Sequence, residues 1–451
     1  MAADIEEFDV VVLGLGPGGE QVAGRLAEAG LAVAGVESRL VGGECPYWAC
    51  VPTKMMVRAA DLLAEGGRIP SMAGEATVVP DWAPVARRIR EEATDNWDDK
   101  VAADRFHDQG GTLVRGRGRI TAPGEVTVDG SRVLRARRGI VVATGSQPAV
   151  PPIAGLAGTP YWTNREATEA ERAPESIIVL GGGAVGVEFG QVLRRFGAEV
   201  TVLEAAGGLL PSEEPEAGEL LAEVFAKEGI TVRTDAKVTR VDHHGSAFTV
   251  MTEDGSHRAE RLLVATGRRC DLAAIGVGAV GLEESAQVIK VDDRMRAAEG
   301  VWAVGDVTGE GAFTHVAVYQ ARVALADILG EHGPAADYRA VPRVTFTDPE
   351  VGAVGLTERQ ARERGLAVRT AATPVASSAR GWIHRGVGLV KLVADEDALV
   401  GATVAGPCGG EVLGLLTLAV HERTPLDRLT SMIYAYPTFH RAVEDTLSLL
   451  R

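Results

Sequence analysis

Cys45 and Cys50 are the residues of this 451-residue sequence whose type and spacing point most directly to chemistry. The chain has four cysteines, and these two form a Cys-x4-Cys motif downstream of a glycine-rich segment. Two thiols at this separation can close a redox-active disulfide. The spacing is too wide for the usual Cys-x2-Cys zinc knuckle, and no second Cys/His pair completes a metal site. A redox role is therefore favoured over buried or metal-binding thiols.

The glycine-rich segment upstream of the cysteines has the pattern of a dinucleotide-binding fold. Glycines in G-x-G-x-x-G let backbone N–H groups and a helix N-terminus approach a pyrophosphate, and a later acid accepts hydrogen bonds from ribose hydroxyls. The sequence predicts a strand, the glycine loop, a helix, a second strand and the acid in this order: 9–13; Gly14, Gly16 and Gly19; 20–29; 31–36; Glu37.

The same pattern returns in the middle of the chain, after a second apolar run at 176–180. The acid follows the first glycine by 23 residues in both copies, and both copies later close on Ala-Thr-Gly. Matching motifs at matching spacing predict two dinucleotide-binding domains. The second copy supplies Gly181, Gly183, Gly186 and Glu204, and the two Ala-Thr-Gly segments supply Thr144, Gly145 and Gly267.

The position of the cysteines assigns a nucleotide to each domain. Because they follow the first fingerprint, the first domain should hold the cofactor that touches them, FAD, and the second should hold the hydride donor. Glu204 suits a free ribose 2′-hydroxyl, whereas a 2′-phosphate would favour Arg there. Residues 205–208 offer no cation. NADH is therefore favoured over NADPH, although a more distant Arg could still reach the site.

Composition limits the partners and the compartment. The formal net charge of −16 argues against nucleic acid or an anionic membrane as a partner. No apolar run is long enough to span a bilayer, and the acidic N-terminus does not resemble a signal peptide. With few cysteines, we expect a cytoplasmic multidomain protein in which a disulfide is catalytic rather than structural.

In this order, the flavin fingerprint, Cys-x4-Cys motif and second fingerprint resemble the class I pyridine nucleotide-disulfide oxidoreductases, which include lipoamide dehydrogenase, glutathione reductase and mercuric reductase. Segment 301–306 resembles the family's second flavin motif, 314–317 the helix start beneath the isoalloxazine, and 342–350 the start of the dimerisation domain. These segments add Gly305, Asp306, His315, Val316 and Ala317 to the expected cofactor contacts.

The resemblance implies an α/β fold with two Rossmann-like domains, for FAD and NAD, and a C-terminal α+β dimerisation domain. The FAD domain is expected to be interrupted by the NAD domain and then completed. The expected boundaries are 1–148 for the first part of the FAD domain, 149–268 for the NAD(P) domain, 269–338 for the central part and 339–451 for the dimerisation domain.

The resemblance also implies roles for single residues. Cys50 would lie against the flavin as the charge-transfer thiolate, and Cys45 would be the interchange thiol that attacks the substrate. Both are expected in the first turn of a helix, whose N-terminal partial charge would favour thiolate. Lys54 would pair with Glu188 near the flavin N5.

The C-terminal segment departs from the family pattern. Disulfide-reducing members present a His-Pro-Thr segment to the partner subunit's disulfide, with a Glu five residues later. Here Tyr436 stands at the histidine position and Arg441 at the glutamate position. A tyrosine is a poor base at neutral pH, although its hydroxyl can donate a hydrogen bond. His440 and Glu444 could supply a relocated dyad, but we favour a surface pair.

Other departures concern the remaining cysteines and the residues between the redox pair. Tyr47 and Trp48 could narrow the approach to Cys45 or stack on a planar substrate, yet packing is the favoured interpretation. Cys270 and Cys408 match no functional cysteine of the family. The chain also lacks a C-terminal vicinal cysteine pair and an N-terminal Cys-x2-Cys module, which disfavours mercury as substrate.

The function expected from the sequence is that of a homodimeric NADH-dependent flavoprotein reductase. Electrons would pass from NADH to FAD, to Cys45–Cys50, and on to a lipoamide-like disulfide. One alternative is an NADH-dependent reductase of quinones or other small acceptors that uses the flavin directly. Another is an E3-type subunit docking on a 2-oxoacid dehydrogenase core, and a pure redox sensor is disfavoured by the complete NAD site.

Overall fold

The computed structural model of the chain describes residues 5–450, which divide into two compact units. The first unit consists of residues up to 53, 87–149 and 268–338. The second consists of residues 54–86, 150–267 and the chain from 339 onward. Each unit is therefore built from segments that are far apart in the sequence.

The first unit is centred on a mixed sheet with the strand order β16-β17-β6-β1-β2-β3, in which β17, β6, β1, β2 and β3 are parallel. An antiparallel hairpin, β4–β5, joins it through β6, and a short ladder pairs β7 with β15. The strands are β1 (Ile5–Leu13), β2 (Val33–Glu37), β3 (Thr112–Arg115), β4 (Gly118–Ala122), β5 (Glu125–Val128), β6 (Arg132–Val142), β7 (Gln147–Pro148), β15 (Arg268–Arg269), β16 (Arg296–Ala298) and β17 (Val301–Ala303).

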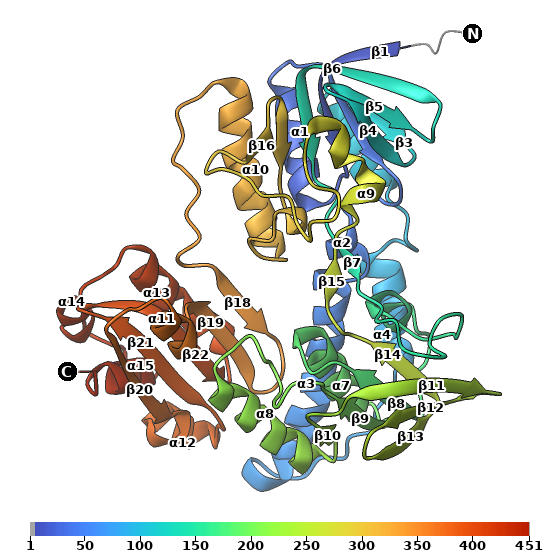
Figure 1. The fold of residues 1–451 in the computed structure, drawn as a ribbon. Helices are drawn as coiled ribbons and strands as arrows, with labels where there is room; N and C mark the ends of the chain where they lie inside the picture. Colours follow the sequence, from blue (N-terminus) through green and yellow to red (C-terminus); the bar gives the residue numbers. More distant parts are fainter. Residues whose placement is uncertain (1–4, 451) are drawn as a thin grey trace. The chain divides into compact units, whose positions relative to one another are not determined.

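Helices cover this sheet, and α1 and α10 lie side by side against it (Figure 1). Residues 10–13 of β1 are at most 1% exposed, which explains why the strand reads as a continuous apolar run rather than an alternating one. The helices that begin in this unit are α1 (Pro17–Glu28), α2 (Glu44–Tyr47), α3 (Cys50–Met72), α5 (Lys100–Asp108), α9 (Leu272–Ile275) and α10 (Thr314–Leu329), with single turns at Ile89–Ala93, Val277–Val280 and Asp306–Thr308.

The second unit contains the second dinucleotide fold, a four-stranded parallel sheet ordered β10-β9-β8-β14. An antiparallel sheet of β11, β12 and β13 is inserted before β14. The elements of this part of the second unit are α4 (Ala83–Arg88), α6 (Asn164–Thr168), β8 (Ser176–Leu180), α7 (Ala184–Arg195), β9 (Glu199–Leu203), α8 (Pro215–Glu228), β10 (Thr231–Arg233), β11 (Val238–His244), β12 (Ala247–Thr252), β13 (Gly255–Ala259) and β14 (Arg261–Val264). The last two residues of α4 belong to the first unit.

The C-terminal part of this unit is a five-stranded antiparallel sheet in the order β18-β19-β22-β21-β20. Apolar residues of β20, β21, β22, α13 and α15 form its core. The elements are β18 (Pro342–Thr345), β19 (Glu350–Gly355), α11 (Glu358–Glu363), β20 (Val368–Pro374), a turn at Val375–Ser377, α12 (Ala379–His384), β21 (Leu389–Asp395), β22 (Ala398–Gly406), α13 (Gly409–His421), α14 (Leu426–Thr430) and α15 (His440–Leu447).

The expected α/β fold, with two Rossmann-like sheets and a C-terminal α+β part, is confirmed. The domain boundaries stay predictions. Residues 54–86, which the sequence placed in the FAD domain, cluster with the second unit, because α3 continues well past its first turn. Within residues 5–450, no helix is both long and apolar enough to cross a membrane.

Lys391 holds the C-terminal sheet to α8 and α11 through a buried charge cluster. Its Nζ lies 2.9 Å from Glu214 Oε2, 2.7 Å from Glu216 Oε1 and 3.0 Å from Glu358 Oε2. The side chains of Lys391 and Glu214 are only 6% and 3% exposed. A buried carboxylate that loses its cation is left uncompensated, so this lysine should be needed for folding.

Replacing Lys391 by Met should therefore lower the free energy of unfolding by about 3–5 kcal/mol. The matched control is Lys100→Met, because Lys100 pairs with Asp104 on the exposed face of α5, where such pairs contribute about 0–1 kcal/mol. Urea unfolding followed by circular dichroism measures both. Equal losses of unfolding free energy in the two variants would show that the buried Lys391 cluster stabilises the fold no more than an exposed ion pair does.

Candidate active site

The first glycine loop is shaped by two glycines that cannot carry a side chain. A Cβ on Gly14, whose φ is +88°, would lie 2.5 Å from the carbonyl oxygen of Ala143, and one on Gly19 would lie 1.9 Å from the oxygen of Gly14. The middle glycine differs, since the nearest atom to a Cβ on Gly16 would be 4.0 Å away, at Gly43 Cα. The outer glycines thus allow the close packing, and the middle one leaves open backbone where a pyrophosphate can approach.

The second loop repeats this arrangement. A Cβ on Gly181 would lie 2.4 Å from the oxygen of Ala265, and one on Gly186 would lie 1.9 Å from the oxygen of Gly181. A Cβ on Gly183 would meet nothing within 4 Å. Both loops lead into the first turn of a twelve-residue helix, α1 or α7, whose N–H groups and positive dipole end favour a bound phosphate.

The two ribose acids are also held in the same way. Glu37 accepts hydrogen bonds at 2.8 Å from the backbone N–H groups of Leu15 and Arg39. Glu204 accepts from Gly182 at 2.5 Å and from Ala206 at 2.6 Å. In both copies the carboxylate is fixed against its own glycine loop, so each loop and acid fits a dinucleotide. Which nucleotide each copy holds stays a prediction. Burial raises the pKa of Glu37, while the two N–H donors act in the opposite direction.

An ion pair that the sequence did not single out braces the segment between Glu37 and the cysteines. Arg115 is the last residue of β3. It binds both oxygens of Asp99 at 2.6 and 2.8 Å and donates to the carbonyl of Arg39 at 2.9 Å. Asp99 in turn accepts from the N–H of Val41 at 2.6 Å. The only signal in the sequence was a carboxylate at the start of a helix, which is too common to indicate this role.

Cys45 and Cys50 lie on two different helices, which corrects the expectation that both occupy the first turn of one helix. Cys45 is in the four-residue α2, and Cys50 is the first residue of α3. The N–H of Thr53 bonds to the carbonyl of Ala49 at 3.0 Å, so the hydrogen bonding of α3 begins there. Pro52, which has no N–H, is tolerated only because it lies in this first turn. The structure has all four cysteines as thiols, with no disulfide among them.

The environments of the two sulfurs differ. The Cys50 Sγ lies 3.4 Å from the Oγ1 of Thr314, the first residue of α10. A hydrogen bond with Cys50 and burial both raise the pKa of the Cys45 thiol. Both effects oppose the thiolate form that the sequence led us to expect for Cys45, and the roles of the two sulfurs stay predictions.

A chain of polar contacts connects Asp306 with the residue before Cys45. The Ser146 hydroxyl donates to Asp306 Oδ2 at 2.5 Å, and Arg268 Nε donates to the same hydroxyl at 2.7 Å. The other end of the Arg268 guanidinium lies 3.4 Å from Glu44. Sequence reasoning found Asp306 but missed Ser146, Arg268 and Glu44, which are far apart in the chain. Cys270, which had no assigned role, has its Sγ 3.8 Å from the Asp306 carbonyl oxygen.

The other predicted flavin residues surround the start of α10. The N–H of Gly305 donates to the buried Gln320 at 2.6 Å, and Val316 and Ala317 are 3% and 6% exposed. The ring of His315 stacks on Phe313 with the centroids 5.2 Å apart. The turn residues lie where the chain leaves each parallel sheet: Thr144, Gly145 (φ +64°) and Gly267 (φ +113°).

In the second unit, Lys54 and Glu188 form the predicted ion pair. Lys54 Nζ lies 2.6 Å from Glu188 Oε2, and it also lies 4.6 Å from the centre of the Phe346 ring. The other oxygen of Glu188 accepts from the backbone N–H of Phe346 at 2.8 Å. The glutamate side chain is 9% exposed and the lysine 35%. The segment before β19 therefore fixes the pair.

The C-terminal segment places Tyr436 in the open and pairs Glu444 with Arg441. Tyr436 is 73% exposed, and the Arg441 guanidinium lies 6.0 Å from the centre of its ring. Glu444 forms an ion pair with Arg441. The relocated dyad of His440 and Glu444 stays a prediction.

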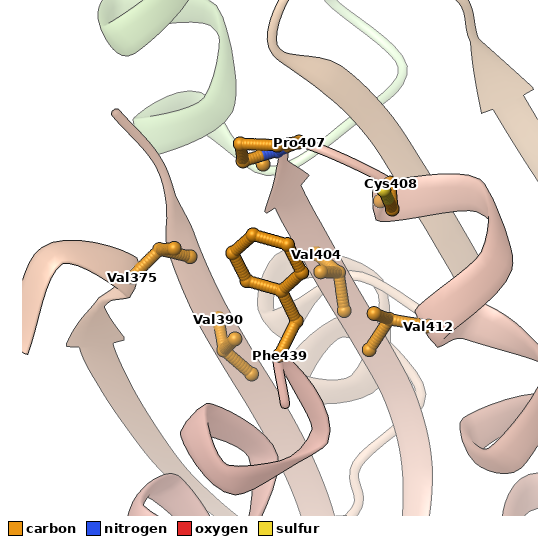
Figure 2. Close-up of a pocket in the computed structure, with 9 residues that line it drawn as sticks. Val375, Val390, Val404, Pro407, Cys408, Val412 and Phe439 are labelled. Atoms are coloured by element: carbon orange, nitrogen blue, oxygen red, sulfur yellow. The ribbon is translucent and has the colours of Figure 1, made fainter. Parts of the chain in front are cut away.

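Phe439 anchors this segment in the C-terminal sheet. Figure 2 shows its ring pointing into a small apolar hollow, with Cys408 at the edge. Because one aromatic ring fills the hollow between β21, β22 and α13, the neighbouring Tyr436 and His440 are held at a defined place on the sheet. The hollow is lined by Val375, Val390, Val404, Gly406, Pro407, Cys408, Gly409 and Val412.

The chain combines two glycine-loop nucleotide folds with a cysteine pair at helix starts and a C-terminal antiparallel sheet. This combination is that of a pyridine-nucleotide-dependent flavoprotein that works through a disulfide. The family model described as pyridine nucleotide-disulphide oxidoreductase matches residues 8–321. The model of the dimerisation domain of the same family matches residues 341–447. The chain belongs to this family and is an FAD-dependent enzyme that also binds NAD(P)H.

Relatives of different named activities resemble the chain to a similar degree. The mercuric reductase of Shewanella putrefaciens is 33% identical over 444 residues, covering 95% of this chain and 78% of that enzyme. The dihydrolipoyl dehydrogenase of Chlorobaculum tepidum is 33% identical over 453 residues, covering 97% and 96%. The HOCl-induced flavoprotein disulfide reductase RclA of Escherichia coli, solved as a Cu(II) complex, superposes with a TM-score of 0.85 at 27% identity, covering 99% and 100%.

The second glycine loop yields a prediction about nucleotide binding. Gly183→Ala should raise KM for NADH about tenfold, because its methyl group would project into the open space where the pyrophosphate approaches. Steady-state kinetics with NADH measure this effect, and the bound flavin should be retained. Gly190→Ala is the matched control, since Gly190 lies in α7 and its Cβ would meet only Val202 and Val200 of β9, at ordinary contact distances of 3.6 and 3.7 Å. An unchanged KM in Gly183→Ala would place the pyrophosphate elsewhere.

Proposed function

We propose that this enzyme uses NADH to reduce a small disulfide through Cys45 and Cys50. The observation that carries the proposal is the asymmetry of the two sulfurs. Cys50 opens the 23-residue α3 and lies 3.4 Å from Thr314, the first residue of α10, whereas Cys45 lies in the four-residue α2. A sulfur held at the start of a long helix suits the charge-transfer role, and a sulfur on a short element suits attack on an external substrate.

The bound FAD would supply two-electron transfer between NADH and the cysteine disulfide, held by the glycine loop, Glu37, Asp306 and the start of α10. Once the pair is reduced, Cys45 attacks one sulfur of the substrate as the thiolate and forms a mixed disulfide. The departing thiolate takes up one proton, which balances the one that Cys45 loses, and leaves as the first thiol. Cys50 then attacks the Cys45 sulfur, which releases the second thiol and re-forms the Cys45–Cys50 disulfide. Two protons and two electrons thus pass to the substrate.

The proton donor for the leaving thiolate is proposed to come from the C-terminal segment of the partner subunit. The family's dimerisation domain supports a homodimer. Exposed apolar residues beside the segment, Met432 at 42% and Ile433 at 98%, fit a surface that is covered by a second copy. The Tyr436 hydroxyl is suited to donate a proton to a thiolate and poorly suited to accept one from Cys45.

NADH is the proposed donor because Glu204 is locked to the loop that would face the adenosine ribose. A fixed carboxylate accepts from a 2′-hydroxyl and repels a 2′-phosphate. The acceptor is proposed as a lipoamide-like disulfide, by analogy with the dihydrolipoyl dehydrogenase relatives. Docking on a 2-oxoacid dehydrogenase core and a cytoplasmic location are further expectations of this proposal.

The loss of the family histidine favours one second candidate, direct reduction of quinones or other small acceptors by the flavin. Tyr436 at that position weakens the proton transfer that thiol–disulfide exchange needs, whereas a flavin that reacts directly needs no such base. The two candidates differ in whether Cys45 is required.

Replacing Cys45 by Ser should lower turnover of disulfides by about 1000-fold or more, because no interchange sulfur remains. Flavin reduction by NADH should persist, and anaerobic visible spectra would follow it. Cys408→Ser is the control, since this exposed thiol lies in the C-terminal sheet region and should leave turnover unchanged. Full disulfide turnover in Cys45→Ser would refute the proposal. Quinone turnover that survives while every disulfide fails as a substrate of the native enzyme would favour the flavin-only reaction.

Replacing Tyr436 by Phe should lower disulfide turnover about tenfold while leaving flavin reduction by NADH unchanged, because only the donor to the leaving thiolate is lost. Stopped-flow measurement of each half-reaction separates the two effects. His440→Gln serves as the comparison and should stay within about twofold of the native rate. The opposite ranking would transfer the role to His440.

A further inference from the structure

Three residues on one face of α7 continue inward from the Lys54–Glu188 pair. Glu188, Gln191 and Arg195 are spaced three and four residues apart, so they lie in a row along the helix. The row ends at Arg195, whose side chain is 7% exposed although it is a charged residue in the last turn. Figure 1 shows α7 beside α3, the helix that supplies Lys54.

The segment before β19 is attached to this row along its whole length. Phe346 donates its N–H to Glu188, and Asp348 donates its N–H to the Gln191 side chain at 2.8 Å. The Gln191 amide also donates to the Asp348 carbonyl at 2.9 Å, and Arg195 binds the Asp348 carboxylate at 2.8 Å. A shift of Asp348 would therefore be transmitted to Phe346, and from there to Glu188.

The α3 side of the row has the matching spacing. Lys54, Asp61 and Arg68 are seven residues apart and so lie on one face of this helix. Lys54 binds Glu188, Asp61 binds Arg195 at 2.8 Å, and Arg68 binds Asp348. The two helices and the segment 346–348 are thus joined at both ends of the row by charged contacts.

Arg195 is the centre of the charged cluster at the end of the row that lies away from the Lys54–Glu188 pair. Its guanidinium contacts three carboxylates at 2.8 Å each, those of Asp61, Glu228 and Asp348. With Arg68 included, the contacting groups are two cations and three anions when all are ionised. The charged groups that face Asp61 are Arg195, Asp348 and Arg58, of which Arg58 is exposed and paired with Glu65. One proton on a carboxylate would make the five contacting groups neutral.

The carboxylates of this cluster respond differently to their surroundings. Burial, with Asp348 as a further cause, raises the pKa of Asp61 to about 6, while Arg195 acts in the opposite direction. For Asp348, the cations Arg195 and Arg68 outweigh burial and hold the pKa below its usual value. Of these two aspartates, Asp61 is therefore the one expected to change charge within the range of ordinary assays.

We propose that the cluster around Arg195 is a positioning device for the Lys54–Glu188 pair, and that the charge state of Asp61 sets how firmly segment 346–348 and α3 hold this pair for hydride transfer from NADH. The inference rests on the proposed function in one respect, namely the role of Lys54 and Glu188 beside the flavin. Asp61, Arg195 and Asp348 act through this pair and do not themselves touch the reacting atoms.

The test is the pH profile of flavin reduction by NADH, followed by anaerobic stopped flow from pH 5 to 8 in the FAD-loaded enzyme. The native enzyme should show an inflection near pH 6, where Asp61 titrates. Asp61→Asn, which keeps the shape but cannot ionise, should remove that inflection and hold the rate at pH 8 near the native low-pH value, about fivefold below the native rate at pH 8. Asp61→Glu should restore most of the inflection.

The Asp61→Asn variant should remain folded, because the pKa of Asp61 is raised rather than lowered on folding. Because the pKa of Asp61 is raised on folding, its contribution to stability is present below the ordinary aspartate value and is lost as the pH rises through about 6. At pH 8 the ionised group opposes folding, so Asp61→Asn should not lower the thermal midpoint. Retained FAD and an unchanged midpoint establish this before the kinetics are compared.

Two further variants distinguish the possible failures. Glu363→Gln is the control, since Glu363 pairs with Arg359 on the exposed face of α11 and should leave the profile native. Lys54→Met tests the pair itself. If Lys54→Met slows flavin reduction but Asp61→Asn retains the native profile, the positioning inference is overturned and the proposed function stands. If Lys54→Met has no effect, the role assigned to the Lys54–Glu188 pair fails, and this inference fails with it.

Discussion

The absence of a Cβ at four glycines is the constraint on which both nucleotide folds depend. At Gly19 and Gly186 a methyl group would lie 1.9 Å from a carbonyl oxygen, a distance at which no packing is possible. Only without that methyl group can α1 and α7 start directly against the strands that precede them. Once each helix starts there, its N–H groups and the neighbouring acid converge on one small volume, and the nucleotide sites follow from that convergence.

The strand, loop and helix order of both nucleotide folds could be predicted from the sequence because it depends on local signals. Apolar runs, glycine spacing and the terminal acid all lie within about thirty residues, and the repeated spacing excluded chance. The contacts that position the reactive groups could not be found in this way. Arg268 meets Ser146 and Glu44 across large separations in the chain, and the Arg115–Asp99 pair joins two residues that are individually ordinary. Long-range pairing of common residue types leaves no pattern in a single sequence.

The cysteine segment shows how a local signal can be right in kind and wrong in detail. The sequence indicated one helix start that holds both cysteines, and the structure has two starts rather than one. The effect on acidity was not foreseen, since a hydrogen bond with Cys50 and burial both raise the pKa of the Cys45 thiol. A helix of four residues adds little dipole field to oppose them.

The break between α2 and α3 also gives the two sulfurs supports of different stiffness. Cys50 opens a helix of 23 residues, whereas Cys45 belongs to a single turn of four. A single turn has few internal hydrogen bonds to lose, so local opening costs it far less than it costs the long helix. When the disulfide is open, the sulfur that must reach an external molecule is therefore on the softer element, and the sulfur that must stay in register is on the stiffer one. Local opening is thus easier at Cys45, the sulfur that must contact an external substrate, than at Cys50.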